Sequence, residues 1–248
     1  MAKIIAIANH KGGVAKTTSC VNIAAALAKM GRRVLLVDVD PQANLTSSFT
    51  DESKIEASIY DAMKGAPAPI MNISENLDLI PSHIDLAGAD MVFSNKIARE
   101  QILKNILDEL KAGYDYIIID TPPALGLVTI NALTAADSVI ISICAETLPL
   151  RGLVMLDEMI GDIAQSINKG LHVSGIIIAK YNRRKLDNAV IEAIREKYGE
   201  KIYKTYVRTC VSAAEAPTYR QSVLDYAPGS TVAEDYRALA KEIDNQTI

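Results

Sequence analysis

Short apolar runs alternate with longer segments of helical periodicity along most of the chain. The apolar runs are rich in Ile, Val and Leu, and each is too short for a typical helix, so they predict buried strands. They lie near residues 3–8, 33–38, 77–81, 116–120, 138–144 and 173–179. Helices are expected near residues 17–30, 58–63, 86–92, 100–110, 150–167, 187–198 and 231–243, with one more short strand near 202–206. This alternation predicts an α/β fold, a doubly wound, mainly parallel sheet flanked by helices.

The length of 248 residues suits one large α/β domain, and no linker-like stretch interrupts it, so a single domain over residues 1–248 is expected. The core must be filled by Ile, Leu, Val and Ala, because the chain has no Trp and only 2 Phe. No apolar stretch reaches the roughly 18 residues that a membrane span needs. The three cysteines Cys20, Cys144 and Cys210 lack metal-ligand spacing. These features predict a cytoplasmic protein that does not enter membranes.

Charge is distributed unevenly along the chain. Residues 180–220 carry ten Lys or Arg and five acids, a balance of +5. The whole chain has a net charge of −4, so the remainder carries −9. An acidic body with one basic region excludes uniform nucleic-acid binding but is compatible with a local phosphate-binding surface.

The first expected strand leads into a glycine-containing loop, Lys11-Gly12-Gly13-Val14-Ala15-Lys16-Thr17-Thr18, and a helix follows. Strand, loop and helix N-terminus together surround a phosphate chain with backbone N–H groups. Lys16 is expected to reach the terminal phosphates and Thr17 to hold Mg²⁺. The common P-loop has glycine where this chain has His10 and Ala15. The sequence instead matches the deviant pattern Lys-Gly-Gly-x-x-Lys-Thr, with a second lysine at Lys11.

Three aspartates are expected at the carboxyl ends of buried strands. Asp38 ends the second strand, Asp40 follows in the next loop, and Asp120 ends the strand at residues 116–120. Open α/β sheets bind ligands at this edge. An aspartate at the end of such a strand suits an outer-shell contact to Mg²⁺, which makes Asp120 a candidate beside Thr17.

These motifs, in this order, resemble the ParA/MinD superfamily of deviant Walker ATPases, and most closely its ParA (Soj-like) partition group. The resemblance extends through Asp38-Val39-Asp40-Pro41-Gln42, Asp120-Thr121-Pro122-Pro123 and Ala214-Glu215-Ala216-Pro217. It implies that ATP and Mg²⁺ are the cofactors. It also implies three catalytic residues: Lys11 reaches across an ATP-bound dimer to the partner's phosphates, Lys16 stabilises phosphate charge, and Asp40 orients the attacking water. Asp38 and Asp120 would support the metal and its waters, and the metal site implied in this way comprises Thr17, Asp38, Asp40 and Asp120.

The resemblance also implies partners and a cellular role. Relatives of this group dimerise on ATP binding, bind nonspecific DNA, and are stimulated by a ParB-like centromere-binding protein, so nucleoid association is expected. The DNA-contacting candidates are Arg183, Arg184, Lys185, Arg208 and Arg220; a second arginine of the family appears in this chain as Ser212. Asn182 and Arg208 are the candidates for the adenine contact, by position only.

Ala15 stands where most relatives have glycine. If this position requires positive φ, alanine costs on the order of 1 kcal/mol and could slow closure of the loop on phosphate.

Other functions stay open at the level of sequence. One is a MinD-like membrane-positioning ATPase, or a switch that positions another cargo. A second is a reductase like the nitrogenase iron protein, which needs paired cysteines for an iron–sulfur cluster. A third is a binding module with an inert loop.

Overall fold

The computed structural model describes residues 2–145 and 150–246, and the side chains of residues 150 and 151 are not described. Its centre is a seven-stranded sheet of order β3-β4-β2-β5-β1-β6-β7. Every neighbouring pair is parallel except β3 and β4. The strands are β1 (Lys3–Ala8), β2 (Val34–Asp38), β3 (Met71–Ser74), β4 (Leu77–Ile80), β5 (Tyr116–Asp120), β6 (Ser138–Cys144) and β7 (His172–Ala179). The predicted doubly wound, mainly parallel α/β fold is confirmed.

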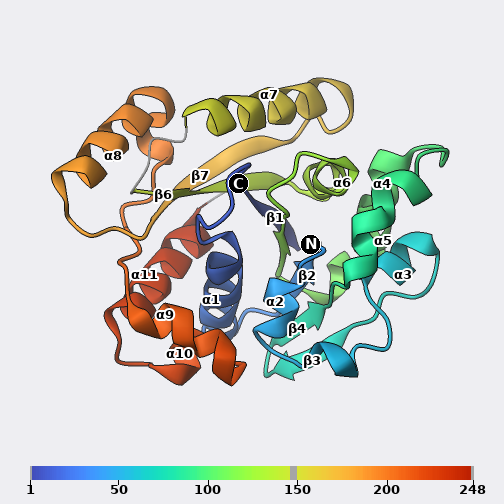
Figure 1. Cartoon of the computed structure of the whole chain (residues 1–248), viewed down its shortest axis with the longest axis horizontal. Helices are drawn as coiled ribbons and strands as arrows, with labels where there is room; N and C mark the ends of the chain where they lie inside the picture. The colour runs from blue at the N-terminus through green and yellow to red at the C-terminus, as the bar shows by residue number, and fades with distance from the viewer. Residues whose placement is uncertain (1, 146–149, 247–248) are drawn as a thin grey trace.

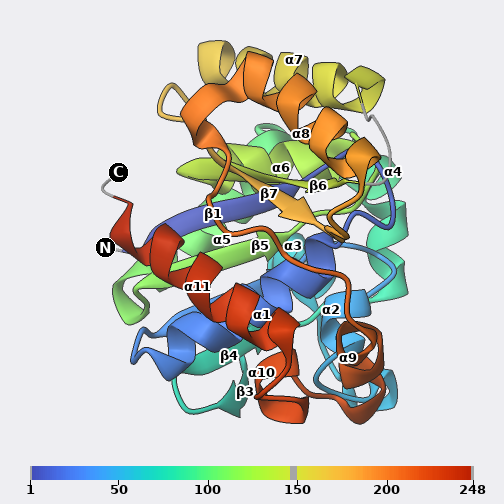
Figure 2. The ribbon, with the colours of Figure 1, turned by 90° about the vertical axis from the view of Figure 1, so that its left-hand side faces the viewer.

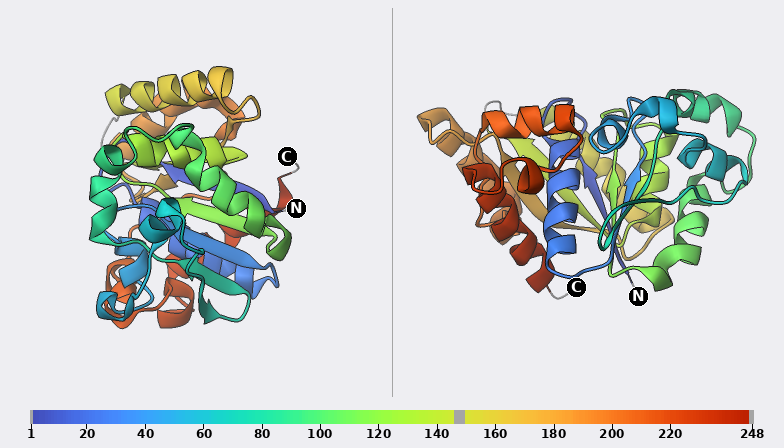
Figure 3. Two further views of the ribbon diagram at one scale, coloured as in Figure 1. Left: turned by 90° about the vertical axis from the view of Figure 1, so that its right-hand side faces the viewer. Right: turned by 90° about the horizontal axis from the view of Figure 1, so that it is seen from below.

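Both faces of the sheet are buried because alternate residues of the central strands enter different cores. In β1, Ile4 and Ala6 pack into one apolar cluster, whereas Ile5 and Ile7 pack into the other. A strand that is apolar at every position therefore needs helices on both sides, and Figures 1 and 3 show the two helical layers.

The layers have different helices. One face is covered by α1 (Lys16–Lys29), α10 (Val223–Tyr226) and α11 (Thr231–Asn245). The other is covered by α3 (Ile59–Lys64), α5 (Ile102–Leu110), α6 (Leu127–Ala135), α7 (Leu150–Ser166) and α8 (Lys185–Tyr198). Shorter elements complete the chain: α2 (Asn44–Ser47), α4 (Ala89–Val92), α9 (Val211–Glu215), and the 3₁₀ turns η1 (Glu52–Lys54), η2 (Ile84–Gly88), η3 (Arg99–Gln101), η4 (Lys111–Gly113), η5 (Gly199–Lys201) and η6 (Ala216–Tyr219). No described helix has the combination of length and apolar character that spanning a bilayer requires.

The strand predicted at residues 202–206 is wrong. This segment runs beside β7 but joins it only through an isolated bridge between Ile202 and Ile176. The backbone N–H groups of Lys204 and Thr205 donate instead to the carboxylate of Glu242 on α11. A helix thus takes the donors that a strand would have used for its ladder.

Among the helices and strands, α2, α6, α9, α10 and β3 have no counterpart in the sequence prediction. The α6 sequence, Leu-Val-Thr-Ile-Asn-Ala-Leu-Thr-Ala, is mostly apolar and lacks a charged face. Without alternating polar positions it shows no helical period.

Parallel pairing brings the carboxyl ends of β1, β2, β5, β6 and β7 to one edge of the sheet, where α2 and α9 also lie (Figure 2). This edge contains the glycine loop and the three aspartates.

Candidate functional site

The glycine loop, residues 9–16, is held in place by β6. Asn9 donates from its side chain to the carbonyl of Ser142 at 2.7 Å, and its own side-chain oxygen accepts from the backbone N–H of Lys11 at 3.0 Å. The Ser142 hydroxyl donates to the carbonyl of Val14 at 2.6 Å. One residue of the neighbouring strand therefore fixes both ends of the loop, which orients its backbone in advance of any ligand.

Two residues of the loop have left-handed backbone conformations. Gly13 has φ 74°, and Ala15 has φ 64° and precedes the first residue of α1. A Cβ atom added to Gly12 or Gly13 would meet nothing within 4 Å, so the loop faces open space. The backbone at Ala15 does require a positive φ, so alanine adopts a conformation that costs on the order of 1 kcal/mol.

Lys16 and Thr17 start α1 and point toward the acids. Lys16 is 7% exposed, and its ammonium donates to the carbonyl of Lys11 at 3.3 Å. Burial lowers the pKa of Lys16, and the charges of Asp120 and Asp40 oppose that shift. The Thr17 hydroxyl donates to Oδ2 of Asp120 at 2.6 Å. The helix N-terminus, one cation and one hydroxyl thus meet at the carboxyl end of β1, a favourable arrangement for anionic oxygens.

Asp38 and Asp120 are opposite one another in the register of β2 and β5, and both are fully buried. Burial raises the pKa of Asp38 to about 8, and the neighbouring charge of Asp120 adds to the rise. Burial also raises the pKa of Asp120 to about 6, opposed by the hydrogen bond from Thr17 and the charge of Lys16. In such a dry site a nearby cation stabilises the ionised form of a carboxyl group.

Both carboxylate oxygens of Asp38 accept hydrogen bonds from other groups of the protein. Its Oδ1 accepts the backbone N–H of Asp40 at 3.1 Å, and its Oδ2 accepts the backbone N–H and the hydroxyl of Thr46 at 2.9 and 2.7 Å. Asp40 in turn accepts the N–H of Gln42 at 3.0 Å. The geometry makes Asp38 an anchor that positions Asp40 and α2.

The residues around Asp120 fit a magnesium ion. Its Oδ1 is buried and lacks a hydrogen-bond partner in the described structure, while Oδ2 lies against the Thr17 hydroxyl. Among the described residues there is no cluster of three or more His, Cys, Asp or Glu side chains that could hold a metal alone. Mg²⁺ typically binds through one or two protein oxygens plus water and substrate phosphates, so this donor set suits it.

A cleft of about 620 Å³ opens above the loop and α1. Its walls come from the loop, α1, the segment after Asp40, and the segment around η6. They include Gly12, Gly13, Ala15, Lys16, Thr17, Thr18, Val21, Asn22, Asp40, Gln42, Asn44, Ser47, Ser48, Pro123, Lys180, Ala213, Ala216, Pro217, Thr218, Gln221 and Val223.

The two residues predicted to contact adenine, Asn182 and Arg208, are not among the residues that line the cleft. The Asn182 side chain donates to the carbonyl of Lys180, and the Arg208 guanidinium pairs with Asp235 of α11 at 2.6 Å. The structure therefore favours Lys180 and the residues around η6 as the wall at that end of the cleft.

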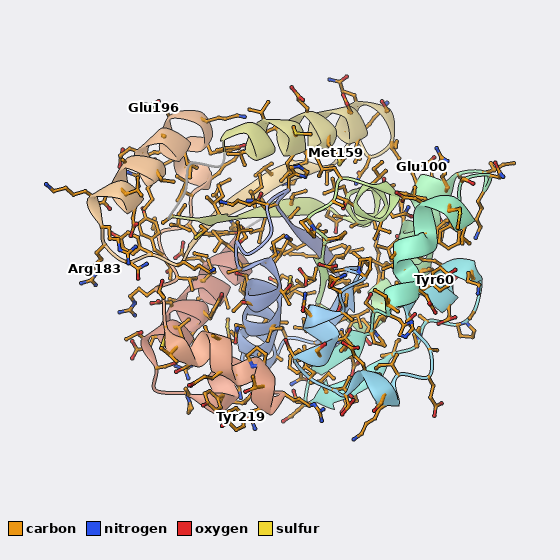
Figure 4. The ribbon with its side chains drawn as sticks, in the orientation of Figure 1. Tyr60, Glu100, Met159, Arg183, Glu196 and Tyr219 are labelled. Atoms are coloured by element: carbon orange, nitrogen blue, oxygen red, sulfur yellow. The ribbon has the colours of Figure 1, made fainter. Side chains whose placement is uncertain are left out.

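The basic candidates differ in their surroundings. Arg183, Arg184 and Lys185 are exposed at the start of α8, and within residues 2–145 and 150–246 they form no ion pair within 4 Å. Figure 4 shows Arg183 at the outer margin of the molecule. Arg208 and Arg220 are instead paired with acids, Arg220 with Asp51 at 2.6 Å. Their charge is already partly neutralised, which weakens them as phosphate contacts.

Sequence reasoning missed Thr46, Lys180 and the cleft residues 213–223. Thr46 is eight residues after Asp38 and its hydroxyl also accepts the N–H of Ser82, a contact between distant segments that no local motif signals. The segment 213–223 includes the Glu-Ala-Pro motif quoted above, which is the sequence feature that could have identified these residues as part of the site. Its docking depends on the side chain of Asn22, which accepts the N–H of Val223 at 2.8 Å.

Comparison with known proteins places the chain among partition ATPases. A family model described as an AAA domain matches residues 2–173. The chain is 44% identical to the sporulation initiation inhibitor protein Soj of Bacillus subtilis, over 98% of both chains. It is 34% identical to the chromosome partitioning protein ParA of Caulobacter vibrioides, over 97% of this chain and 93% of that one.

A solved structure is similar throughout. The crystal structure of cobyrinic acid a,c-diamide synthase from Mycobacterium smegmatis, which contains ADP and magnesium, has a TM-score of 0.86 and 35% identity, and covers 98% of this chain and 94% of that one. The names of these proteins differ in function, and what the solved structure shares with this chain is the fold.

Proposed function

Since the chain belongs to the ParA group of the ParA/MinD superfamily, we propose that it is a magnesium-dependent ATPase that partitions DNA, working as an ATP-bound dimer. The observation that carries this proposal is the convergence of Lys16, the Thr17–Asp120 hydrogen bond and Asp40 on one cleft. Phosphoryl transfer needs positioned charge and a held water more than covalent chemistry, and these residues supply such positions.

In the proposed reaction, the backbone of the loop and Lys16 bind the β- and γ-phosphates, and Thr17 and Asp120 are the residues that would hold Mg²⁺. Mg²⁺, when bound, supplies a positive charge that neutralises the phosphate oxygens. Asp40, 7% exposed and fixed by Asp38, orients the attacking water. Because Asp38 uses both of its oxygens on protein donors, its contribution is to hold Asp40 rather than to touch the metal.

Lys11 is assigned to the partner copy. It is exposed on the rim of the loop, and its carbonyl accepts the Lys16 ammonium. Two ammonium groups directed at one triphosphate from the same loop would repel each other. A Lys11 that reaches the nucleotide of a second copy avoids this conflict and couples dimerisation to ATP.

DNA binding is assigned to Arg183, Arg184 and Lys185. These cations lie next to the carboxyl end of β7, on the same edge of the sheet as the cleft. They would contact phosphates, so binding would show little sequence preference and would weaken steeply with salt. Arg208 and Arg220 are left out because Asp235 and Asp51 already bind them. The remaining parts of the proposal are a ParB-like protein that stimulates hydrolysis, and a cytoplasmic, nucleoid-associated location.

The test compares DNA retention of the wild type with that of an Arg183→Ala/Arg184→Ala double variant, each with ADP and with a nonhydrolysable ATP analogue. A Lys169→Ala/Lys241→Ala variant removes the same charge from exposed lysines elsewhere. We expect only the wild type and the control to bind DNA, only with the analogue, and equal ATP affinity in all three proteins. Equal retention of the arginine double variant would contradict the assigned DNA surface. Pelleting with anionic liposomes separates the MinD-like alternative, which predicts membrane binding.

A further inference from the structure

Lys180 directly follows β7 and lines the cleft. It belongs neither to the glycine loop nor to the group of three aspartates, so the roles assigned above do not include it. The sheet order shows which end of a bound nucleotide it faces. Asp38 and Asp120 are on β2 and β5, to one side of β1, whereas β6 and β7 lie to the other side. Strands are spaced at about 4.8 Å, so β5 and β7 are roughly 14 Å apart. A triphosphate whose terminal end lies at the acids therefore extends toward β7 with its nucleoside.

The backbone of Lys180 is left-handed, with φ 54°. This conformation is unfavourable for an L-residue, and it is maintained only where the surroundings determine it. The next residues supply that constraint. The N–H of Tyr181 donates to the carbonyl of Val207 at 3.0 Å, and the N–H of Asn182 donates to the buried Asp187 at 2.7 Å. The fold thus holds Lys180 at the cleft against its backbone preference.

The wall beside Lys180 is apolar. The backbones of Tyr181 and Arg208 form an isolated β-bridge. A few residues after Arg208 the chain reaches Ala213, Ala216 and Pro217, which line the same cleft. Lys180 forms no ion pair within 4 Å among residues 2–145 and 150–246. Small apolar side chains with one cation form a suitable site for a planar aromatic ring, because the ring face attracts positive charge and the lysine stem adds apolar contact.

We propose that Lys180 contacts the nucleoside of the bound nucleotide, with its side chain against the purine ring. This inference rests on the proposed function, because it requires the cleft to bind ATP. It assigns nucleoside recognition to a residue different from the two predicted from sequence, Asn182 and Arg208, neither of which lines the cleft.

The test is calorimetric titration of the wild type and of Lys180→Met with ATP, ADP and inorganic tripolyphosphate. Methionine keeps the length of the stem and removes the charge. We expect Lys180→Met to weaken ATP and ADP equally, by about tenfold, and to leave tripolyphosphate within about twofold of the wild type. The matched control is Lys169→Met, at an exposed lysine outside the cleft, which should change none of the three affinities.

Two results would overturn the inference: nucleotide affinities of Lys180→Met within twofold of the wild type, or an equal loss of tripolyphosphate binding, which would place Lys180 at the phosphates. If Lys180→Met fails to fold, Lys180→Gly serves instead, because glycine adopts φ 54° without strain and should give the same tenfold loss. A wild type that binds no ATP would contradict the proposed function itself, whereas wild-type binding with an unchanged Lys180 variant contradicts only the role of Lys180.

Discussion

The hydroxyl of Thr46 joins three parts of the site, and its removal should be felt in both stability and catalysis. It donates to Oδ2 of Asp38 at 2.7 Å and accepts the backbone N–H of Ser82 at 2.9 Å. All three residues are at most 1% exposed. Thr46→Val replaces this hydroxyl by a methyl group of nearly the same shape, so the change tests the two hydrogen bonds rather than the packing.

The expected magnitude follows from what each partner loses. The N–H of Ser82 is left buried without an acceptor, at a cost of about 1–3 kcal/mol. Asp38 keeps the backbone N–H groups of Thr46 and Asp40, so the loss of one further donor costs about 1 kcal/mol. Together these predict a decrease of about 2–4 kcal/mol in the free energy of unfolding. With a urea dependence of about 2–3 kcal/mol per molar, the midpoint should fall by about 0.7–2 M.

Urea denaturation followed by circular dichroism measures the change, with Thr46→Ser as the control. Serine keeps the hydroxyl and loses only a methyl group, so it should cost about 1 kcal/mol. We also expect Thr46→Val to bind ATP normally and to hydrolyse it more slowly, because the P-loop is intact but the support of Asp40 through Asp38 is weakened. The reasoning is refuted if valine is no more destabilising than serine.

Three further predictions concern the backbone and the buried acids. Ala15→Val should lower the free energy of unfolding by about 2 kcal/mol, since a β-branched residue tolerates φ 64° poorly, while Ala15→Gly should match or exceed the wild type in urea. Gly175→Ala should cost about 1–3 kcal/mol because its Cβ would overlap the ring of Tyr203, whereas Gly161→Ala, which has open space in α7, should be neutral or stabilising in thermal melts. Finally, the pKa of Asp38 is raised to about 8, so the folded, nucleotide-free chain keeps a proton that the unfolded chain releases. The free energy of unfolding should therefore fall as pH rises from 6 to 8. Asp38→Asn should flatten this dependence on pH. A slope unchanged by the substitution would argue against the raised pKa.

The elements that the sequence predicted well are those whose signal is local. The strands around Ile4, Leu36 and Ile118 are apolar except at their ends, and the loop and its acids occur where such strands end. Because parallel strands share one edge, the order of these motifs was enough to bring Lys16, Asp40 and Asp120 together.

What the sequence could not predict depends on partners far along the chain. The segment at residues 202–206 has the composition of a strand, but the carboxylate of Glu242, about forty residues later, binds its N–H groups. The guanidinium of Arg208 had the right position for a ligand contact, yet Asp235 takes it, 27 residues away. Lys180 lines the cleft and has a left-handed backbone conformation, which no pattern of residues in the sequence predicts.

The central claim is that ATP joins two copies of this chain through Lys11, and sedimentation tests it most directly. With magnesium and a nonhydrolysable ATP analogue, the wild type should sediment at about twice the chain mass of 26.8 kDa, and with ADP at the mass of one chain. Lys11→Ala should remain a single copy under both conditions while still binding nucleotide. A wild type that stays a single chain when saturated with the analogue, or a Lys11→Ala variant that dimerises as readily, would contradict the account.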